Sequence, residues 1–349
     1  MTTKRANWLF LTIILVHIGV VLFLRFGGSR ISIDMVTNFL LSEGILMIPT
    51  ALFLFAFARK DRQRQPAGQQ GVEAAKPGAL GTFEAAAFHK VKISTFLMIA
   101  LSTFLIMPLV AVLNALSMLF ADNVMESLRG NIVDTSFPAM LLMVGIVGPF
   151  CEEFVFRGVI YRSYRKNEWD QSSGCYGNNL RSGISEILLS ALLFGLMHMN
   201  FNQMIYAFAM GIFLALLVEA AGSLWASVFC HMFFNSVEVV LMYVSDRLTD
   251  SIYEQTAVAA ELTTQQLLAA LAFYLIIAAV TTPIAGCIVV WIAKNEGRQQ
   301  PFSALFFRQK RQDAPGMQNG QEPYYLLSVP LIVAIVLCLG YMSLEFFFW

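Results

Sequence analysis

The chain has 349 residues, of which 57% are hydrophobic and 13% are charged, and its formal net charge is zero. Soluble proteins carry about 25% charged residues, so this composition excludes a disordered chain, a basic nucleic-acid binder and a secreted disulfide scaffold. It predicts an all-α, multi-pass integral membrane protein, because apolar helices are the usual way for such a chain to satisfy its backbone in lipid.

A helix needs about 20 residues to cross a bilayer. The sequence has nine apolar stretches that could do so. The predicted spans are 8–25, 36–58, 93–121, 137–160, 184–200, 203–219, 224–245, 264–293 and 325–348. Pro108 and Pro283 lie in the two longest stretches and are expected to kink them. The links at 199–202 and 220–223 are very short, so the fifth, sixth and seventh spans must pack as antiparallel neighbours. A count of eight spans stays open.

Basic residues gather on one side of these spans. With a cytoplasmic N-terminus, 19 of the 23 Lys and Arg residues fall in cytoplasmic segments, as the positive-inside rule requires. The four on the other side are Arg25, Arg30, Arg129 and Arg247. We therefore expect a cytoplasmic N-terminus, a C-terminus outside, and a location in the cell (plasma or inner) membrane.

The fourth predicted span carries charges that a bilayer disfavours. Glu152, Glu153 and Arg157 lie within six residues, and one ionisable side chain at mid-bilayer costs roughly 2.5–3.5 kcal/mol. Glu153 and Arg157 are four residues apart, so they can pair along one helix face. Glu152 points about 100° away from Glu153 and needs a partner on another helix. The simpler alternative is a structural ion pair beside a carboxyl group that stays neutral.

Two of the four histidines lie in the tightly linked trio of spans. Phe194 and His198 are four residues apart, as are His231 and Asn235, so each pair shares a helix face. A helical rise of about 1.5 Å per residue lets Glu152, His198 and His231 converge in the cytoplasmic-to-middle part of the membrane. A lone buried histidine is more often a core residue, but two of them near an acidic pair favour a functional site.

This set of side chains suits amide hydrolysis, which needs a base for water, donors for the oxyanion and an acid for the leaving amine. Glu152 near His198 suits the base, and His231 with Asn235 suits the oxyanion site. Glu152, His198 and His231 would equally suit a zinc ion that activates water. The spacing leaves both mechanisms open, so the expected cofactor is either none or a divalent metal such as zinc.

Three short motifs occur in order on successive predicted spans. They are EExxxR from Glu152 to Arg157, FxxxH from Phe194 to His198, and HxxxN from His231 to Asn235. This pattern resembles the CPBP (ABI) family of intramembrane endopeptidases, which includes the type II CAAX prenyl proteases (Rce1-like) and bacteriocin-processing or immunity relatives. The resemblance covers about residues 137–240, and it implies a helical intramembrane peptidase core that opens to the cytoplasm.

The resemblance also implies roles for the matching residues. Glu152 would activate the water together with His198, and His231 and Asn235 would stabilise the oxyanion. The expected positioning residues are Glu153, Arg157 and Phe194. Expected partners are the lipid bilayer and a peptide or protein substrate, which could be lipidated, with no nucleic acid.

The expected organisation has three parts. N-terminal spans fill 1–136 with a cytoplasmic linker at 59–92, the catalytic core fills 137–245, and C-terminal spans fill 246–349 with a cytoplasmic loop at 294–323. The rival hypothesis is a non-catalytic transporter or an immunity or scaffold protein on the same fold, because buried acids and histidines also build proton relays. Paired broken helices, which mark many transporters, are not apparent in the sequence.

Overall fold

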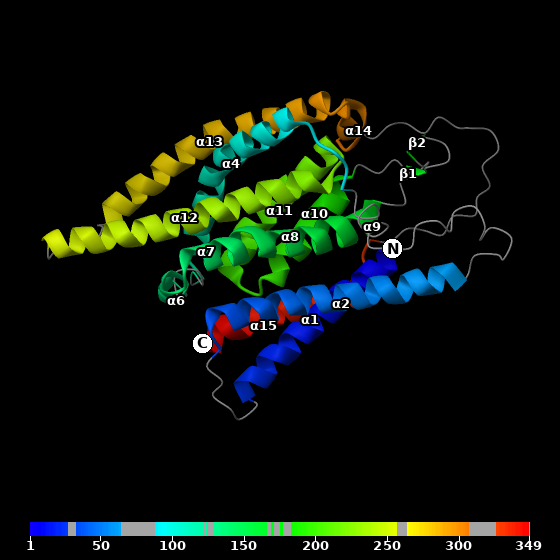
Figure 1. The fold of residues 1–349 in the computed structure, drawn as a ribbon, viewed down its shortest axis with the longest axis horizontal. Coiled ribbons are helices and arrows are strands. Elements are labelled where there is room, and N and C mark those ends of the chain that lie inside the picture. The colour runs from blue at the N-terminus through cyan, green and yellow to red at the C-terminus, as the bar shows by residue number, and fades with distance from the viewer. Residues whose placement is uncertain are drawn as a thin grey trace.

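A computed structural model shows helices packed side by side (Figure 1). It describes residues 1–26, 33–63, 88–121, 123, 129–165, 169–170, 175–176, 183–256, 264–306 and 326–348. Most of the expected linker at 59–92 and part of the expected loop at 294–323 therefore lie outside the described residues. The long helices are α1 (Thr3–Phe26), α2 (Met35–Gln63), α4 (Ile93–Ser117), α10 (Ile184–Met197), α11 (Phe201–Ala221), α12 (Leu224–Thr256), α13 (Thr264–Asn295) and α15 (Val329–Phe348).

The fourth predicted span consists of five successive short helical segments and is not one regular helix. In order they are α7 (Phe137–Met140), η1 (Leu141–Val147), α8 (Gly148–Glu153), η2 (Phe154–Tyr161) and α9 (Arg162–Arg165), of which η1 and η2 are π-helical. The shorter elements elsewhere are α6 (Arg129–Asp134), α14 (Gln299–Ala304), and the antiparallel two-residue strands β1 (Trp169–Asp170) and β2 (Cys175–Tyr176). π-helical turns are rare and occur frequently at functional sites, and here they flank the segment that carries Glu152 and Glu153.

Seven helices of the described chain are long and apolar enough to cross a membrane. These stretches are Thr3–Phe26, Met35–Phe57, Ile93–Ser117, Phe137–Arg165, Phe201–Ala221, Leu224–Leu248 and Leu271–Asn295, and Ile184–Met197 and Val329–Leu344 are shorter apolar helices. The predicted all-α, multi-pass membrane fold is confirmed. The fifth predicted span is shorter than expected: α10 has 14 residues, about 21 Å of helix, because the chain turns at His198.

The turn between α10 and α11 is tight, as the short link predicts. Met199 takes a left-handed conformation with φ 53°, and the Asn200 side chain caps α11 by accepting a hydrogen bond from the Gln203 backbone N–H at 2.9 Å. The two helices then approach closely at Gly195, where an added Cβ would lie 2.7 Å from the Met204 carbonyl oxygen. Glycine is therefore needed at this crossing, and it brings His198 at the end of α10 close to the bundle interior.

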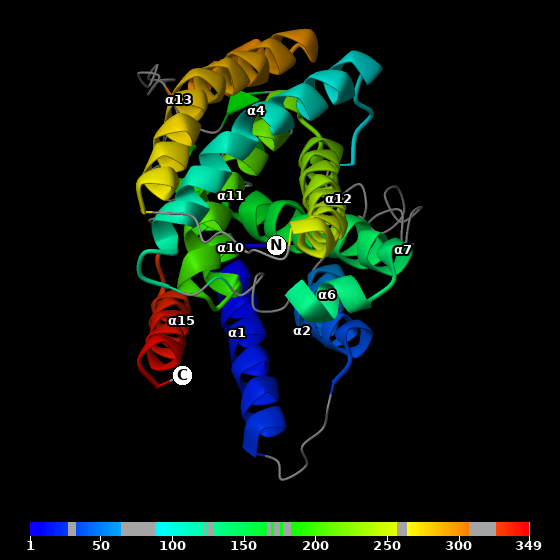
Figure 2. The same cartoon turned by 90° about the vertical axis from the view of Figure 1, so that its left-hand side faces the viewer.

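The segment α8 lies between α12 on one side and α2 on the other, as the two views show together (Figures 1 and 2). Outside this centre, α13 packs along α4, and α15 packs along α1. Pro108 and Pro283 both lie inside continuous helices, α4 and α13. Because α8 is enclosed by neighbours, its polar side chains must find partners within the protein.

Candidate active site

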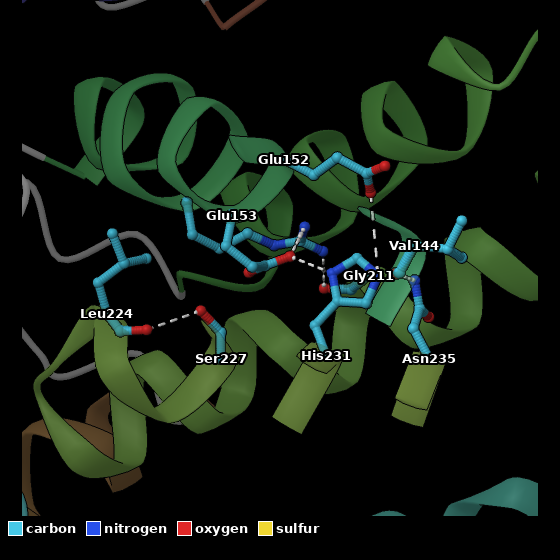
Figure 3. A network of polar contacts seen from close by, with 9 residues as sticks. Val144, Glu152, Glu153, Gly211, Leu224, Ser227, His231 and Asn235 are labelled. Atoms are coloured by element: carbon cyan, nitrogen blue, oxygen red, sulfur yellow. Dashed lines mark hydrogen bonds and ion pairs between the residues drawn. The ribbon is translucent and has the colours of Figure 1, made fainter. Parts of the chain in front are cut away.

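Glu153 is the centre of a buried ionic cluster that joins two helices. Its Oε1 accepts a hydrogen bond from Arg157 Nη1 at 2.6 Å and lies 3.1 Å from His231 Nδ1 (Figure 3). The Glu153 and Arg157 side chains are fully buried, and His231 is 7% exposed. The ion pair that the four-residue spacing predicts is present, and His231 of α12 extends it across the interface with α8.

Glu152 lies on the opposite side of the same imidazole ring. Its Oε2 is 3.8 Å from His231 Nε2, which is too long for a direct hydrogen bond. The Glu152 side chain is 17% exposed, whereas that of Glu153 is not exposed. Within the described residues, the histidine contacting Glu152 is thus His231 and not His198, because α8 faces α12 here. The two carboxylates bracket one histidine, and Glu152 is the more accessible of the two.

Phe194 stands between the two histidines and the arginine. Its ring centroid is 5.2 Å from that of His198 and 5.7 Å from that of His231, both edge-on. Arg157 Cζ lies 4.2 Å above the same ring, a cation–π contact that stabilises a desolvated guanidinium. The aromatic residue of the FxxxH motif therefore orients groups from three helical segments. His198 is half-buried, and no side-chain hydrogen bond to it is found among the described residues.

Arg157 is also fixed from α11. Its Nη2 donates to the Gly211 carbonyl oxygen at 3.2 Å, and a Cβ at Gly211 would lie 3.3 Å from that nitrogen. Glycine at this position lets the guanidinium reach the backbone. Arg157 thus contacts a carboxylate, a carbonyl group and an aromatic ring, which are three different ways of offsetting the loss of water around a buried charge.

Asn235 lies one helical turn beyond His231 and joins α12 to η1. Its Nδ2 donates to the Val144 carbonyl oxygen at 3.1 Å, and Ser236 Oγ donates to the Gly145 carbonyl oxygen at 3.4 Å. Backbone carbonyls of a π-helical stretch are hydrogen-bonded differently from those of an α-helix, and here two of them accept side-chain donors. The Asn235 amide has a second N–H donor that this bond does not use.

Sequence reasoning missed one acidic residue beside this cluster. Glu43 of α2 lies against α8 beside Gly148 and interacts with the Cys151 thiol. The signal was available, because an ionisable residue within the apolar stretch 36–58 is a candidate for function by default. Glu238, in contrast, lies on α12 beyond Asn235 and is exposed.

A zinc site would need three or more His, Cys, Asp or Glu side chains placed around one point. Among the residues that the structure describes, no three His, Cys, Asp or Glu side chains are grouped so that they could hold a metal ion. His231 contacts Glu153 through Nδ1, and its Nε2 lies 3.8 Å from Glu152 Oε2. Glu152, His198 and His231 are thus not grouped as a three-ligand site in the described residues, and no step below is assigned to a metal.

The fold and this cluster together define a class: a multi-pass helical membrane protein with a buried carboxylate–histidine–arginine site between its helices. Comparison with known proteins finds a family model that matches the part of the chain that carries this cluster. Residues 134–237 match the model of the type II CAAX prenyl endopeptidase Rce1-like family, a range that contains all three motifs. This segment of the chain is similar to the Rce1-like family.

Two curated relatives also match part of the chain. The "Putative membrane peptidase YdiL" of Bacillus subtilis is 29% identical over 105 residues, which is 30% of this chain and 37% of YdiL. The "Membrane-embedded CAAX protease MroQ" of Staphylococcus aureus is 27% identical over 124 residues, which is 36% of this chain and 47% of MroQ. The matches thus span less than half the length of each relative. No solved structure matches the chain.

Proposed function

We propose that the protein is an intramembrane endopeptidase that hydrolyses a peptide bond in a peptide or in the tail of a membrane-associated protein. The observation that carries this proposal is the bracketing of His231 by two carboxylates, one fully buried and one accessible, inside a helical membrane bundle. The family match supports it, as do the names of the two relatives, one a membrane peptidase and the other a CAAX protease.

In this proposal Glu152 is the general base, because it is the more exposed carboxylate and lacks the arginine that neutralises Glu153. It accepts a proton from water as the water oxygen attacks the carbonyl carbon. Glu153 holds His231 through Nδ1, so that Nε2 faces the reacting groups. When it carries a proton, Nε2 donates to the developing oxyanion together with the second N–H of Asn235.

His198 has a supporting role in the proposal. Its ring is held edge-on by Phe194, four residues earlier on α10, so its orientation is set by packing. Its nitrogens are available to the water or the substrate, which suits the role of helping Glu152 to hold the attacking water. Glu153, Arg157 and Phe194 are positioning residues, since each acts through His231, His198 or another member of the cluster.

The first test asks whether the protein hydrolyses peptides at all. Purified protein in lipid nanodiscs is incubated in H2¹⁸O with a pool of peptides, half of them carrying a C-terminal prenyl group. We expect one ¹⁸O atom in the new carboxyl end of each product by mass spectrometry, and no product with Glu152→Ala. Comparing the two halves shows whether a lipidated tail is preferred. A wild-type protein that yields no labelled product, or a Glu152→Ala variant that yields as much, would support the transporter or scaffold hypothesis instead.

The second test concerns metal dependence. Because the carboxylate–histidine cluster does not group three metal donors, we expect prolonged dialysis against EDTA to leave the rate of cleavage unchanged within about twofold. The measurement is the initial rate before and after dialysis, with added Zn²⁺ as the reverse arm. Loss of activity that Zn²⁺ restores would contradict the metal-free mechanism and would indicate a site rearranged around Glu152, His198 and His231.

A further inference from the structure

The helix α2 brings a third carboxyl group to α8, against the face that carries Gly148 and, one turn later, Glu152. Phe39 and Glu43 are one helical turn apart on α2, and both lie against Gly148 at the start of α8. A Cβ added at Gly148 would lie 3.4 Å from Phe39 Cε2 and 3.5 Å from Glu43 Oε1. The absent side chain at Gly148 therefore allows α2 to approach α8, and Figure 1 shows α2 beside α8.

The Glu43 carboxyl group is incompletely satisfied in this position. One contact is with the Cys151 thiol, the residue directly before Glu152. Its Oε2 is buried and has no hydrogen-bond partner among the described residues. A buried carboxyl oxygen without a partner costs free energy, and in a membrane protein such a group is a candidate for function.

Glu43 lies against the face of α8 that also carries Glu152, because Gly148, which Glu43 contacts, is four residues before Glu152. Two carboxylates near each other in a desolvated site repel when both are ionised, so such a pair tends to retain one proton between them. No positively charged side chain is found in contact with Glu43 among the residues described. A proton shared by Glu43 and Glu152 is thus the simplest way to relieve the repulsion.

The proposed hydrolysis has so far assigned no donor of the proton that the leaving amine takes up. Glu152 takes a proton from water, and His231 and Asn235 are donors to the oxyanion, but the leaving amine needs a proton of its own. Arg157 cannot supply it, since an arginine stays protonated in proteins and this one is committed to Glu153. A protonated Glu43 carboxyl group, whose Oε2 has no hydrogen-bond partner among the described residues, would meet this requirement for an acid.

We propose that Glu43 is the general acid of this site, an assignment that rests on the proposed peptidase function. Water loses a proton to Glu152 and its oxygen bonds to the carbonyl carbon. The tetrahedral intermediate then breaks its C–N bond as the Glu43 proton passes to the amine nitrogen. The products are a carboxylic acid and an amine, and the proton on Glu152 returns to Glu43 through water, which restores the starting state.

Glu43 comes from a part of the chain that carries none of the three motifs. Glu43 lies outside residues 134–237, the range that matches the family model, and it comes from a helix that the three motifs do not include. The acid is therefore contributed by the N-terminal part of this chain to a site whose other groups come from α8, α10 and α12.

A leaving-group experiment tests the assignment, because a general acid matters little when the leaving group needs no proton. The substrates are a peptide cleaved in the ¹⁸O assay and the p-nitrophenyl ester of its acyl half. We expect Glu43→Gln to lower kcat about 100-fold for the peptide and to keep kcat for the ester within about threefold. Glu152→Gln is expected to lower both. Ser42→Ala, at an exposed neighbour on α2, is the matched control and should change neither.

The outcomes separate the possible roles. An equal fall for peptide and ester in Glu43→Gln would show a structural effect and overturn the assignment, as would unchanged peptide cleavage. If Glu43→Gln does not fold, Glu43→Asp replaces it: this variant keeps a shorter acid, so its loss should again be confined to the peptide, and an equal loss on both substrates overturns the proposal. A wild-type protein that cleaves neither substrate contradicts the peptidase function itself, which is a different result.

Discussion

Changing Glu152 to Gln is expected to lower kcat for peptide cleavage by about 100- to 10,000-fold, the range that loss of a general base gives. Gln keeps the size and polarity of the side chain but cannot accept the proton of the attacking water. The change should leave the fold intact, because Glu152 is partly exposed and its contact with His231 Nε2 is 3.8 Å long. The measurement is kcat and KM on one peptide, together with a thermal unfolding curve.

Glu238→Gln provides the control for this variant. Glu238 is an exposed carboxylate on α12, beyond the residues of the site, so the same chemical change there should leave kcat within about twofold. If Glu152→Gln retained full activity with a normal unfolding curve, Glu152 could not be the base, and the assignment of the accessible carboxylate to water activation would be wrong.

Changing Arg157 to Met is expected to cost about 3–5 kcal/mol of unfolding free energy, because it leaves the Glu153 carboxylate buried without its countercharge. The variant also loses the hydrogen bond to the Gly211 carbonyl oxygen and the contact with the Phe194 ring. The measurement is equilibrium unfolding in detergent with increasing denaturant, compared with wild type at the same protein concentration.

Two further variants show whether the loss of stability in Arg157→Met comes from the buried ion pair. Glu153→Gln combined with Arg157→Met removes both charges, so it should recover a large part of the stability lost in Arg157→Met alone. Arg129→Met breaks a pair with Asp246 that is 3.9 Å long and about one third exposed, and such pairs contribute about 0–1 kcal/mol. Equal losses in Arg157→Met and Arg129→Met would mean that the buried ion pair does not stabilise the core.

Relations along one helix were predictable from the sequence. The pairing of Glu153 with Arg157 follows from their spacing of four residues, and the shared face of Phe194 and His198 follows in the same way. The convergence of α8, α10 and α12 was also expected, because short links constrain α10, α11 and α12 to be neighbours. The all-α membrane fold follows from composition and the length of the apolar stretches.

Relations between helices were harder to predict. The sequence predicted that Glu152, His198 and His231 converge, but it did not predict which histidine lies beside Glu152; the described contact is with His231. Spacing tells which residues share a face, but the rotation of one helix against another depends on packing along its whole length. Two π-helical stretches add to this problem, because they change the direction of side chains on both sides of α8.

Glu43 shows the same limit in another form. A single acid in an apolar stretch is visible in the sequence, but its neighbours Gly148 and Cys151 are more than 100 residues away along the chain. Only the packing of α2 on α8 brings them together. To predict such contacts, one must know which helices are adjacent, and none of the three motifs gives that information.

The shortness of α10 has a consequence for the lipid around the protein. A helix of 14 residues falls about 9 Å short of a hydrocarbon layer of about 30 Å. Acyl chains that meet the outward-facing Leu188, which is 42% exposed, must shorten or bend there, and a mismatched helix thins its bilayer at a modest cost. Such thinning would bring headgroups and their hydration closer to the depth at which His198 lies. A substrate segment anchored in the surrounding leaflet would then cross a thinner layer of hydrocarbon beside α10. Beside a full-length helix it would cross the whole layer before it reached water.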